Sequence, residues 1–279
     1  MKTEESEYVG YDGTKMFLRA WLPDAEPRAL VIGIHGLGSH SGLMSFHGES
    51  FAAKGMAFFA PDLRGFGSNP GLKGHVEKFD DYIEDMNSLV KQLKDRMPGK
   101  PAYMFGHSLG GLHVIRYAAT YPNELDGIII PCPAVSERLE ISAGLKIMAK
   151  LLSKLNIKKT FNNGLNFNLL SRNPEVVRRN REDPLRVDDV TPRFATEGLA
   201  ARVEGAKLGP RITLPVLEQQ AGDDLILIPE ENKAFFDTIA SSDKTFKLYP
   251  GLYHDPFEEP GGEELVADMF SWLEERLPS

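Results

Sequence analysis

Short, almost wholly apolar runs recur along the first half of this chain and constrain its fold more than any other feature. They occupy residues 29–34 (ALVIGI), 56–61 (MAFFAP), 102–105 (AYMF) and 127–130 (GIII). Between them, apolar residues return at helical intervals over 82–96 and 109–121. A short apolar run is typical of a strand that is covered on both faces, as in a parallel sheet. Strands and helices that alternate in this way predict an α/β fold with a mostly parallel central sheet.

The alternation resumes near the carboxyl end of the chain. Residues 215–218 and 246–249 are further predicted strands, and residues 263–277 place their apolar side chains on one helical stripe. Residues 134–211 show helical and loop signals but no convincing buried strand. We therefore expect one core domain built from residues 1–133 and 212–279. Residues 134–211 are expected to form a largely helical lobe inserted between two strands of the sheet.

Charge is divided unevenly between these parts. The chain has a formal net charge of −8. Residues 134–211 contain 15 Lys and Arg against 9 Asp and Glu, a net charge of +6, and the rest of the chain carries −14. An acidic chain argues against nucleic-acid binding, which requires an excess of basic residues. The basic lobe is nevertheless compatible with an anionic lipid surface.

Composition excludes several other classes of site. Cys132 is the only cysteine, so one chain cannot form a disulfide framework, a zinc ribbon or an iron–sulfur centre. The histidines lack metal-ligand spacing and residues 106–111 lack a phosphate-loop lysine, so we predict no metal and no cofactor. The first ten residues are acidic, unlike a secretory signal, and no stretch approaches the ~20 apolar residues of a membrane span. These features predict a cytoplasmic protein that at most touches a membrane surface.

Residues 106–111 (GHSLGG) carry the most specific catalytic signal. They lie between the predicted strand at 102–105 and the helix that begins at residue 109. In this context a G-x-S-x-G pattern places a serine hydroxyl on a tight turn above the edge of the sheet. The same turn directs the N–H of Leu109 toward the carbonyl that the serine attacks. Ser108 is therefore the predicted nucleophile.

A second backbone donor is expected from the loop after the strand at 29–34. This loop reads His35-Gly36-Leu37-Gly38, and its glycines allow the close backbone approach that an oxyanion hole requires. The N–H of Leu37 is the candidate partner of the N–H of Leu109.

A serine hydroxyl needs a base to take its proton, and the base needs an acid to orient it. His254 follows the predicted strand at 246–249, at the end of the sheet where catalytic groups collect in open α/β folds. Asp224 follows the strand at 215–218 in a similar loop, and Asp223 is a competing acid. The order Ser108, Asp224, His254 is the chain order of α/β hydrolases.

Several further segments resemble the monoacylglycerol lipase/lysophospholipase branch of the α/β-hydrolase superfamily, over essentially the whole chain. The matching segments are residues 35–42, 62–68, 74–82, 106–111, 171–177, 183–185 and 249–254. The resemblance implies an α/β-hydrolase fold with Ser108, Asp224 and His254 as the triad, which selects Asp224 over Asp223. It also implies an oxyanion hole at Leu37 and Leu109, and a mobile cap formed by residues 134–211. Phe66 departs from the family pattern, which has histidine at this structural position.

One segment of the expected cap bears on the substrate. Over residues 139–159, the side chains of Leu145, Met148, Leu152 and Leu155 fall on one helical face, and five lysines supply charge. A basic amphipathic helix is suited to an anionic lipid surface. Alternatively, the apolar stripe packs on the core and the lysines lie in solvent. We take Leu145, Met148 and Leu152 as candidate substrate contacts, since an apolar cap suits a long acyl chain.

The expected function is hydrolysis of monoacylglycerols or similar single-acyl lipids by a serine esterase. A lysophospholipase, or a general carboxylesterase or thioesterase with the same triad, is an alternative. A ligand-binding receptor on the same fold is the alternative from another class. Peptidase relatives hold a substrate amine with acidic groups in the cap, so the cap charge of +6 disfavours an amide substrate.

Overall fold

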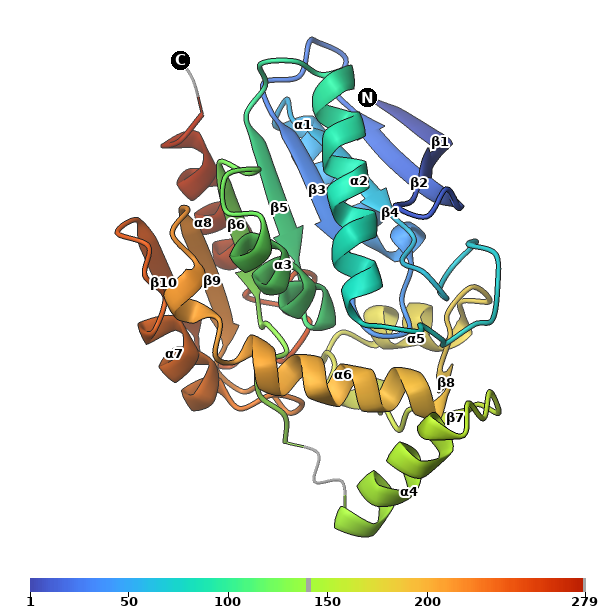
Figure 1. The fold of residues 1–279 in the computed structure, drawn as a ribbon. Coiled ribbons are helices and arrows are strands. Elements are labelled where there is room, and N and C mark those ends of the chain that lie inside the picture. Colours follow the sequence, from blue (N-terminus) through green and yellow to red (C-terminus); the bar gives the residue numbers. More distant parts are fainter. Residues whose placement is uncertain (139–141, 278–279) are drawn as a thin grey trace.

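The computed structural model describes residues 1–138 and 142–277, which are built around an eight-stranded sheet (Figure 1). The strand order is β1-β2-β4-β3-β5-β6-β9-β10. Neighbours from β4 to β10 are parallel, whereas β1 pairs antiparallel with β2 and β2 pairs antiparallel with β4. The strands are β1 (Lys2–Val9), β2 (Lys15–Leu22), β3 (Leu30–Ile34), β4 (Ala57–Pro61), β5 (Ala102–Gly106), β6 (Gly127–Pro131), β9 (Val216–Ala221) and β10 (Lys244–Tyr249). The predicted α/β fold with a mostly parallel sheet is confirmed.

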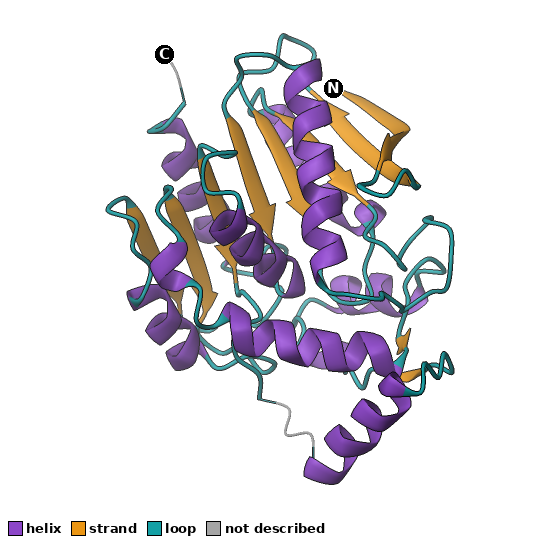
Figure 2. Cartoon of the chain, viewed as in Figure 1, coloured by secondary structure: helices purple, strands orange, loops and turns teal. Residues whose placement is uncertain are grey.

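Helices cover both faces of the sheet (Figure 2). One face carries α2, α3 and α7, and the other carries α1 and α8 (Figure 1). The bounds are α1 (Ser45–Ala53), α2 (Asp80–Arg96), α3 (Leu109–Thr120), α7 (Pro229–Asp237) and α8 (Gly262–Glu274). Along β3, Leu30 and Ile32 enter one core while Val31 enters the other. Because successive side chains of a strand point to opposite faces, two covered faces require apolar residues throughout.

The edge strand β1 was not predicted from the sequence. It pairs with β2 from Lys2 opposite Leu22 to Val9 opposite Lys15. Its side chains are mostly charged or polar and largely exposed, so it lacks the apolar run that marks the inner strands. Charged side chains are common on edge strands, where they discourage pairing with other chains.

The segment between β6 and β9 forms a layer across the carboxyl ends of the strands (Figure 1). It contains α4 (Ala143–Lys154), α5 (Pro174–Glu182) and α6 (Pro192–Gly205), and the short antiparallel pair β7 (Phe161–Asn162) and β8 (Asp189–Val190). The helix predicted over 139–159 corresponds to α4, and residues 139–141 lie outside the described residues. Helix α4 packs against α6 and buries Ala149 and Ser153.

Across residues 1–138 and 142–277, no helix has both the length and the apolar character needed to cross a bilayer.

Candidate active site

Ser108 lies on a sharp turn between β5 and α3. Its backbone has φ 58° and ψ −122°, a conformation that non-glycine residues rarely adopt. The turn is tight enough that a Cβ on Gly110 would lie 2.0 Å from the carbonyl oxygen of Ile34. The sequence therefore needs glycine at position 110 so that α3 can start beside β3 and present the serine hydroxyl at the sheet edge.

The structure brings Ser108, His254 and Asp224 into one hydrogen-bonded chain. His254 Nδ1 lies 2.8 Å from Asp224 Oδ2, and His254 Nε2 lies 2.8 Å from Ser108 Oγ. The Asp224 carboxylate can only accept, so Nδ1–H donates to it, which leaves Nε2 free to accept from the serine hydroxyl. His254 and Asp224 are both buried.

Asp224 is held as an anion by its surroundings. Its Oδ1 atom accepts the backbone N–H groups of Ile226 at 2.8 Å and Leu227 at 2.9 Å. Burial opposes ionisation, but the electrostatic attraction and hydrogen bond between Asp224 and His254, together with these N–H groups, lower the pKa of Asp224 to about 2. Asp223, the competing candidate, is exposed on the same loop.

Buried polar side chains behind Asp224 were missed by the sequence analysis. Gln220 Nε2 lies 3.4 Å from Asp224 Oδ2, and Gln220 Oε1 accepts from Asn232 Nδ2 at 2.8 Å. Ser136 Oγ in turn donates to Asn232 Oδ1 at 2.7 Å. The one available signal was the polar run Glu218, Gln219 and Gln220 inside the buried strand β9.

The two predicted oxyanion donors lie on segments close to Ser108. Leu109 begins α3, where the first N–H groups of a helix have no intrahelical acceptor. Leu37 follows β3, and a Cβ built on the adjacent Gly36 would lie 3.6 Å from the Ser108 Cβ. Within the described residues, neither the Leu37 N–H nor the Leu109 N–H meets a protein acceptor. Both donors are thus available to a ligand.

The loop that carries Leu37 is fixed by Arg186 and Val187 of the inserted segment. Arg186 Nη2 donates to the Leu37 carbonyl at 3.1 Å, and the Val187 N–H donates to the Gly38 carbonyl at 2.8 Å. The Arg186 side chain is only 4% exposed and also binds Asp188 and Asn180. This buried clamp, formed by Arg186 and Val187, joins segments about 150 positions apart along the chain. No local sequence pattern predicts it.

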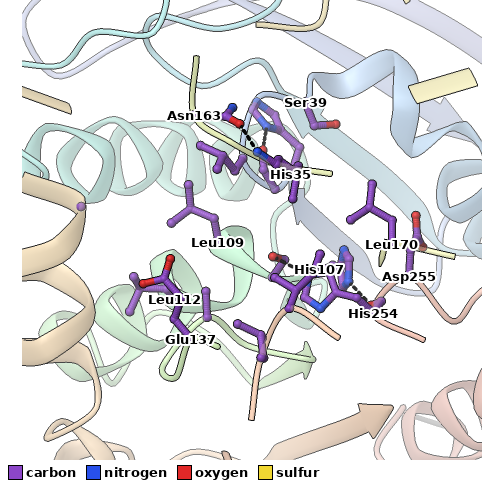
Figure 3. A pocket seen from close by; sticks show the side chains of 18 of the residues that line it. His35, Ser39, His107, Leu109, Leu112, Glu137, Asn163, Leu170, His254 and Asp255 are labelled. Carbon is purple, nitrogen blue, oxygen red and sulfur yellow. Dashed lines mark hydrogen bonds between the residues drawn. The ribbon is translucent and has the colours of Figure 1, made fainter. Parts of the chain in front are cut away.

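A cavity of about 500 Å³ extends from Ser108 and His254 into the inserted segment (Figure 3). Its walls are mainly apolar, with contributions from both the core and the inserted segment. The apolar lining includes Ile34, Leu37, Leu43, Phe79, Leu109, Leu112, Leu165, Leu170, Phe194 and Leu199. The charged residues in the wall are Glu137, Arg179, Arg186, Arg202, Asp255 and Glu258. Such a volume and lining are typical of a site for a small, largely apolar ligand.

The three candidate substrate contacts on α4 occupy different positions. Leu145 lines the cavity, although it is 48% exposed. Met148 is exposed and Leu152 is partly buried, and neither lines the cavity. Helix α4 rests on α6 through the small residues Ala149 and Ser153, and of the three candidate contacts only Leu145 reaches the cavity wall.

One group of side chains has the geometry to hold a metal ion in the described part of the chain. His107, Cys132 and His254 offer ligand atoms within 4.8 Å of one another. His254 already binds Asp224 and Ser108 through its two ring nitrogens, and His107 Nε2 donates to the His254 carbonyl at 2.8 Å. A metal ion here would have to break contacts within the hydrogen-bonded chain of Ser108, His254 and Asp224.

Known proteins resemble this chain along most of its length. The model of the family described as "Serine aminopeptidase, S33" matches residues 25–261, most of the chain. A monoacylglycerol lipase of Mycolicibacterium smegmatis is 31% identical, and the alignment covers 98% of both chains. The chain belongs to the monoacylglycerol lipase-like family of α/β hydrolases. It is a serine hydrolase, and the resemblance inferred from the sequence motifs is confirmed.

Two further relatives of this monoacylglycerol lipase-like hydrolase are a monoacylglycerol lipase of known structure and a phospholipase. The crystal structure of Paleococcus ferrophilus monoacylglycerol lipase is 31% identical, has a TM-score of 0.83, and covers 99% of this chain and 100% of its own. A phospholipase of Bacillus subtilis (strain 168) is 28% identical over 88% of this chain and 94% of its own length.

Phe66, which departs from the pattern of the monoacylglycerol lipase-like family, is buried beside the loop that begins at His35. Its ring packs edge-on against His35 at 6.0 Å and against Phe194 at 5.5 Å. His35 Nε2 accepts the Leu63 N–H at 2.9 Å. Phe66 therefore fills space between the loop and α6, which is a packing role.

Proposed function

We propose that this serine hydrolase cleaves the ester bond of monoacylglycerols or similar single-acyl lipids through an acyl-enzyme on Ser108. The hydrogen-bonded chain from Ser108 through His254 to Asp224, placed at the floor of an apolar cavity, carries the proposal. The contact between Ser108 and His254 suits a nucleophile and its base, and the contact between His254 and Asp224 suits a base and the acid that orients it.

In the acylation step, Ser108 Oγ attacks the ester carbonyl carbon while its proton passes to His254 Nε2. Asp224 stabilises the imidazolium that results. The N–H groups of Leu37 and Leu109 bind the oxygen that becomes negative, and one such donor contributes about 3 to 4 kcal/mol to lowering the barrier. The C–O bond to the alcohol then breaks, and the alcohol leaves with the proton from Nε2.

In the deacylation step, water takes the place of the alcohol. His254 Nε2 accepts a proton from water as its oxygen attacks the acyl carbon bound to Ser108 Oγ. Collapse of the second tetrahedral intermediate returns the proton to Ser108 and releases the fatty acid. The same two N–H groups serve both steps.

Residues 134–211 form the cap in this proposal, and residues 1–133 and 212–279 form the catalytic core. Helix α6 supports this division, because its residues Ala195, Gly198, Leu199 and Arg202 line the cavity opposite the triad. The cavity would therefore lose part of its wall if the cap moved.

The charges in the cavity wall favour an ester over a peptide with a free amine. Among the described residues of the proposed cap, Glu137 is the acidic one that lines the cavity, and it is paired with Arg202. A carboxylate whose charge is already compensated attracts a substrate ammonium group weakly.

Acyl-chain length provides the test of the proposed function. We expect kcat/KM for glyceryl monoesters to rise at least tenfold from acetyl to medium or long acyl chains, since each buried methylene contributes about 0.8 kcal/mol. Mono-, di- and triacylglycerols, a lysophospholipid and an acyl thioester should be compared side by side, with Ser108→Ala as the blank. A series that peaks at two carbons would contradict the proposal. Failure of a fluorophosphonate to label the folded protein would favour the receptor alternative.

We also propose that α4 brings the enzyme to an anionic lipid surface. Ile147, Met148, Leu151 and Leu155 are between 52% and 70% exposed, which is unusual for large apolar side chains. Lys146, Lys150 and Lys154 lie on the same helix. Each lysine near an anionic surface contributes about 1 kcal/mol of attraction.

Vesicle binding tests this proposal for α4. The double variant Ile147→Ser/Leu151→Ser is expected to partition onto anionic vesicles at least tenfold less than wild type, since each buried apolar side chain contributes about 1.5 to 3 kcal/mol. Turnover of a soluble short-chain ester should be unchanged. Leu248→Ser is the matched control, because Leu248 is 52% exposed on the edge strand β10. Equal binding by wild type and the double variant would exclude α4 as the contact.

A further inference from the structure

Asp255 forms the cavity wall on the His254 side of the nucleophile. It follows His254 directly, and its backbone N–H donates to the Leu170 carbonyl at 2.7 Å, which ties this loop to the cap. Figure 3 shows Asp255 beside Leu170 and close to His254, whereas Glu137 lies on the other side of His107. Asp255 therefore lines the side of the cavity near His254, and Glu137 lines the other side.

The Asp255 carboxylate lacks a partner of its own. Among residues 1–138 and 142–277, no protein group donates a hydrogen bond to it and no cation forms an ion pair with it. Its acidic neighbours are both engaged, Glu258 by Arg179 and Glu259 by Arg172. Burial raises the pKa of Asp255 to about 6; His254 and Arg179 oppose the shift, and Glu258 and Glu259 add to it. A partly buried carboxylate without donors favours a ligand that supplies them.

The chemistry of acyl transfer decides which part of an ester meets this carboxylate. The departing alcohol oxygen takes its proton from His254 Nε2, so the alcohol portion must lie against the loop that carries His254. We propose that Asp255 accepts a hydrogen bond from a free hydroxyl of the alcohol portion and so selects esters of polyhydric alcohols over esters of simple alcohols. This inference rests on the proposed function.

The surrounding charges favour a neutral polyol over a phosphate-bearing head group. Arg179 faces the same part of the cavity, but both of its terminal nitrogens bind Glu258. Arg186 is engaged by Asp188, Asn180 and the Leu37 carbonyl. Each guanidinium charge is therefore already balanced by a carboxylate, Glu258 or Asp188, and a phosphate would also meet the negative charge of Asp255.

Three esters of one fatty acid test the role of Asp255: the glyceryl monoester, the methyl ester and lysophosphatidylcholine. Asp255→Val is expected to lower kcat/KM for the glyceryl ester roughly 10- to 100-fold, the loss expected for a hydrogen bond to a charged group. Rates on the methyl ester, which has no free hydroxyl, should stay within about twofold of wild type, and lysophosphatidylcholine, which keeps one free glycerol hydroxyl, should lose no more than the glyceryl ester. Asp255→Asn retains an acceptor oxygen, so its kcat/KM for the glyceryl ester should fall less than that of Asp255→Val. Asp95→Asn, which removes an exposed charge on α2, is the control and should alter none of the rates.

Three outcomes would overturn the inference. An equal loss on all three esters would mean that Asp255 supports His254 or the fold. An unchanged rate on the glyceryl ester would mean that no hydroxyl is bound there, and a loss confined to the lysophospholipid would point to its ammonium group as the ligand. The proposed function fails separately, if wild type cleaves the methyl ester but not the glyceryl ester.

Discussion

The Ser108→Ala variant is expected to fold as wild type does and to hydrolyse esters roughly 10⁴- to 10⁶-fold more slowly. The loss follows from removal of the atom that His254 Nε2 contacts at 2.8 Å, since no covalent acyl-enzyme can then form. The turn itself does not depend on the hydroxyl. The Ser108 N–H donates to the Pro131 carbonyl, and the Ser108 carbonyl accepts from Leu112 and Ala134 through backbone groups alone.

Two measurements separate lost chemistry from lost structure in this variant. Thermal unfolding should give a midpoint close to that of wild type, and a fluorophosphonate probe should label wild type but not Ser108→Ala. Ser271→Ala, on the exposed side of α8, is the matched serine control and should keep full activity and labelling. Near-wild-type turnover by purified Ser108→Ala would place the nucleophile elsewhere.

Asp224→Asn should lower kcat by about 10⁴-fold, although it changes only one atom. Because Ile226 and Leu227 both donate to Oδ1, the amide oxygen of Asn must occupy that position. The amide NH₂ then faces His254 Nδ1, which has to become an acceptor. The proton moves to Nε2, and the ring can no longer accept the proton of Ser108.

Asp223→Asn is the matched control for this substitution. It makes the same chemical change one residue away, on an exposed side chain outside the hydrogen-bonded chain, and kcat should remain within about twofold of wild type. Loss of activity in Asp223→Asn with retention in Asp224→Asn would identify Asp223 as the acid instead. Equal thermal stability of both variants would show that the difference is catalytic.

The predicted triad residues each stand beside a strong local signal, which explains why the sequence indicated them. Ser108 lies between an apolar run and a helix, and His254 and Asp224 each follow a strand whose carboxyl end must reach the same sheet edge. By contrast, β1 consists mostly of charged and polar residues and carries no apolar run. Its pairing with β2 therefore cannot be inferred from its own composition.

Other features depend on contacts between distant segments. Periodicity placed Leu145, Met148 and Leu152 on one face of a helix, but it could not tell which face the rest of the protein would cover. The small residues Ala149 and Ser153 decide this, because they let α4 approach α6 closely. The pairing of Gln220 with Asn232 also joins two elements whose closeness follows only from the folded sheet.

The clamp formed by Arg186 and Val187 bears on how substrate preference in this scaffold could be redesigned. Cap segments such as α4 contact the catalytic core little, so they could be exchanged for those of another hydrolase without disturbing the chemistry. The stretch around 186–187 is different, since it holds the carbonyls of Leu37 and Gly38. A transplanted segment without equivalents of these two residues would remove the bonds that fix the loop of Leu37, the proposed oxyanion donor. Graft boundaries are therefore best placed so that this stretch stays native.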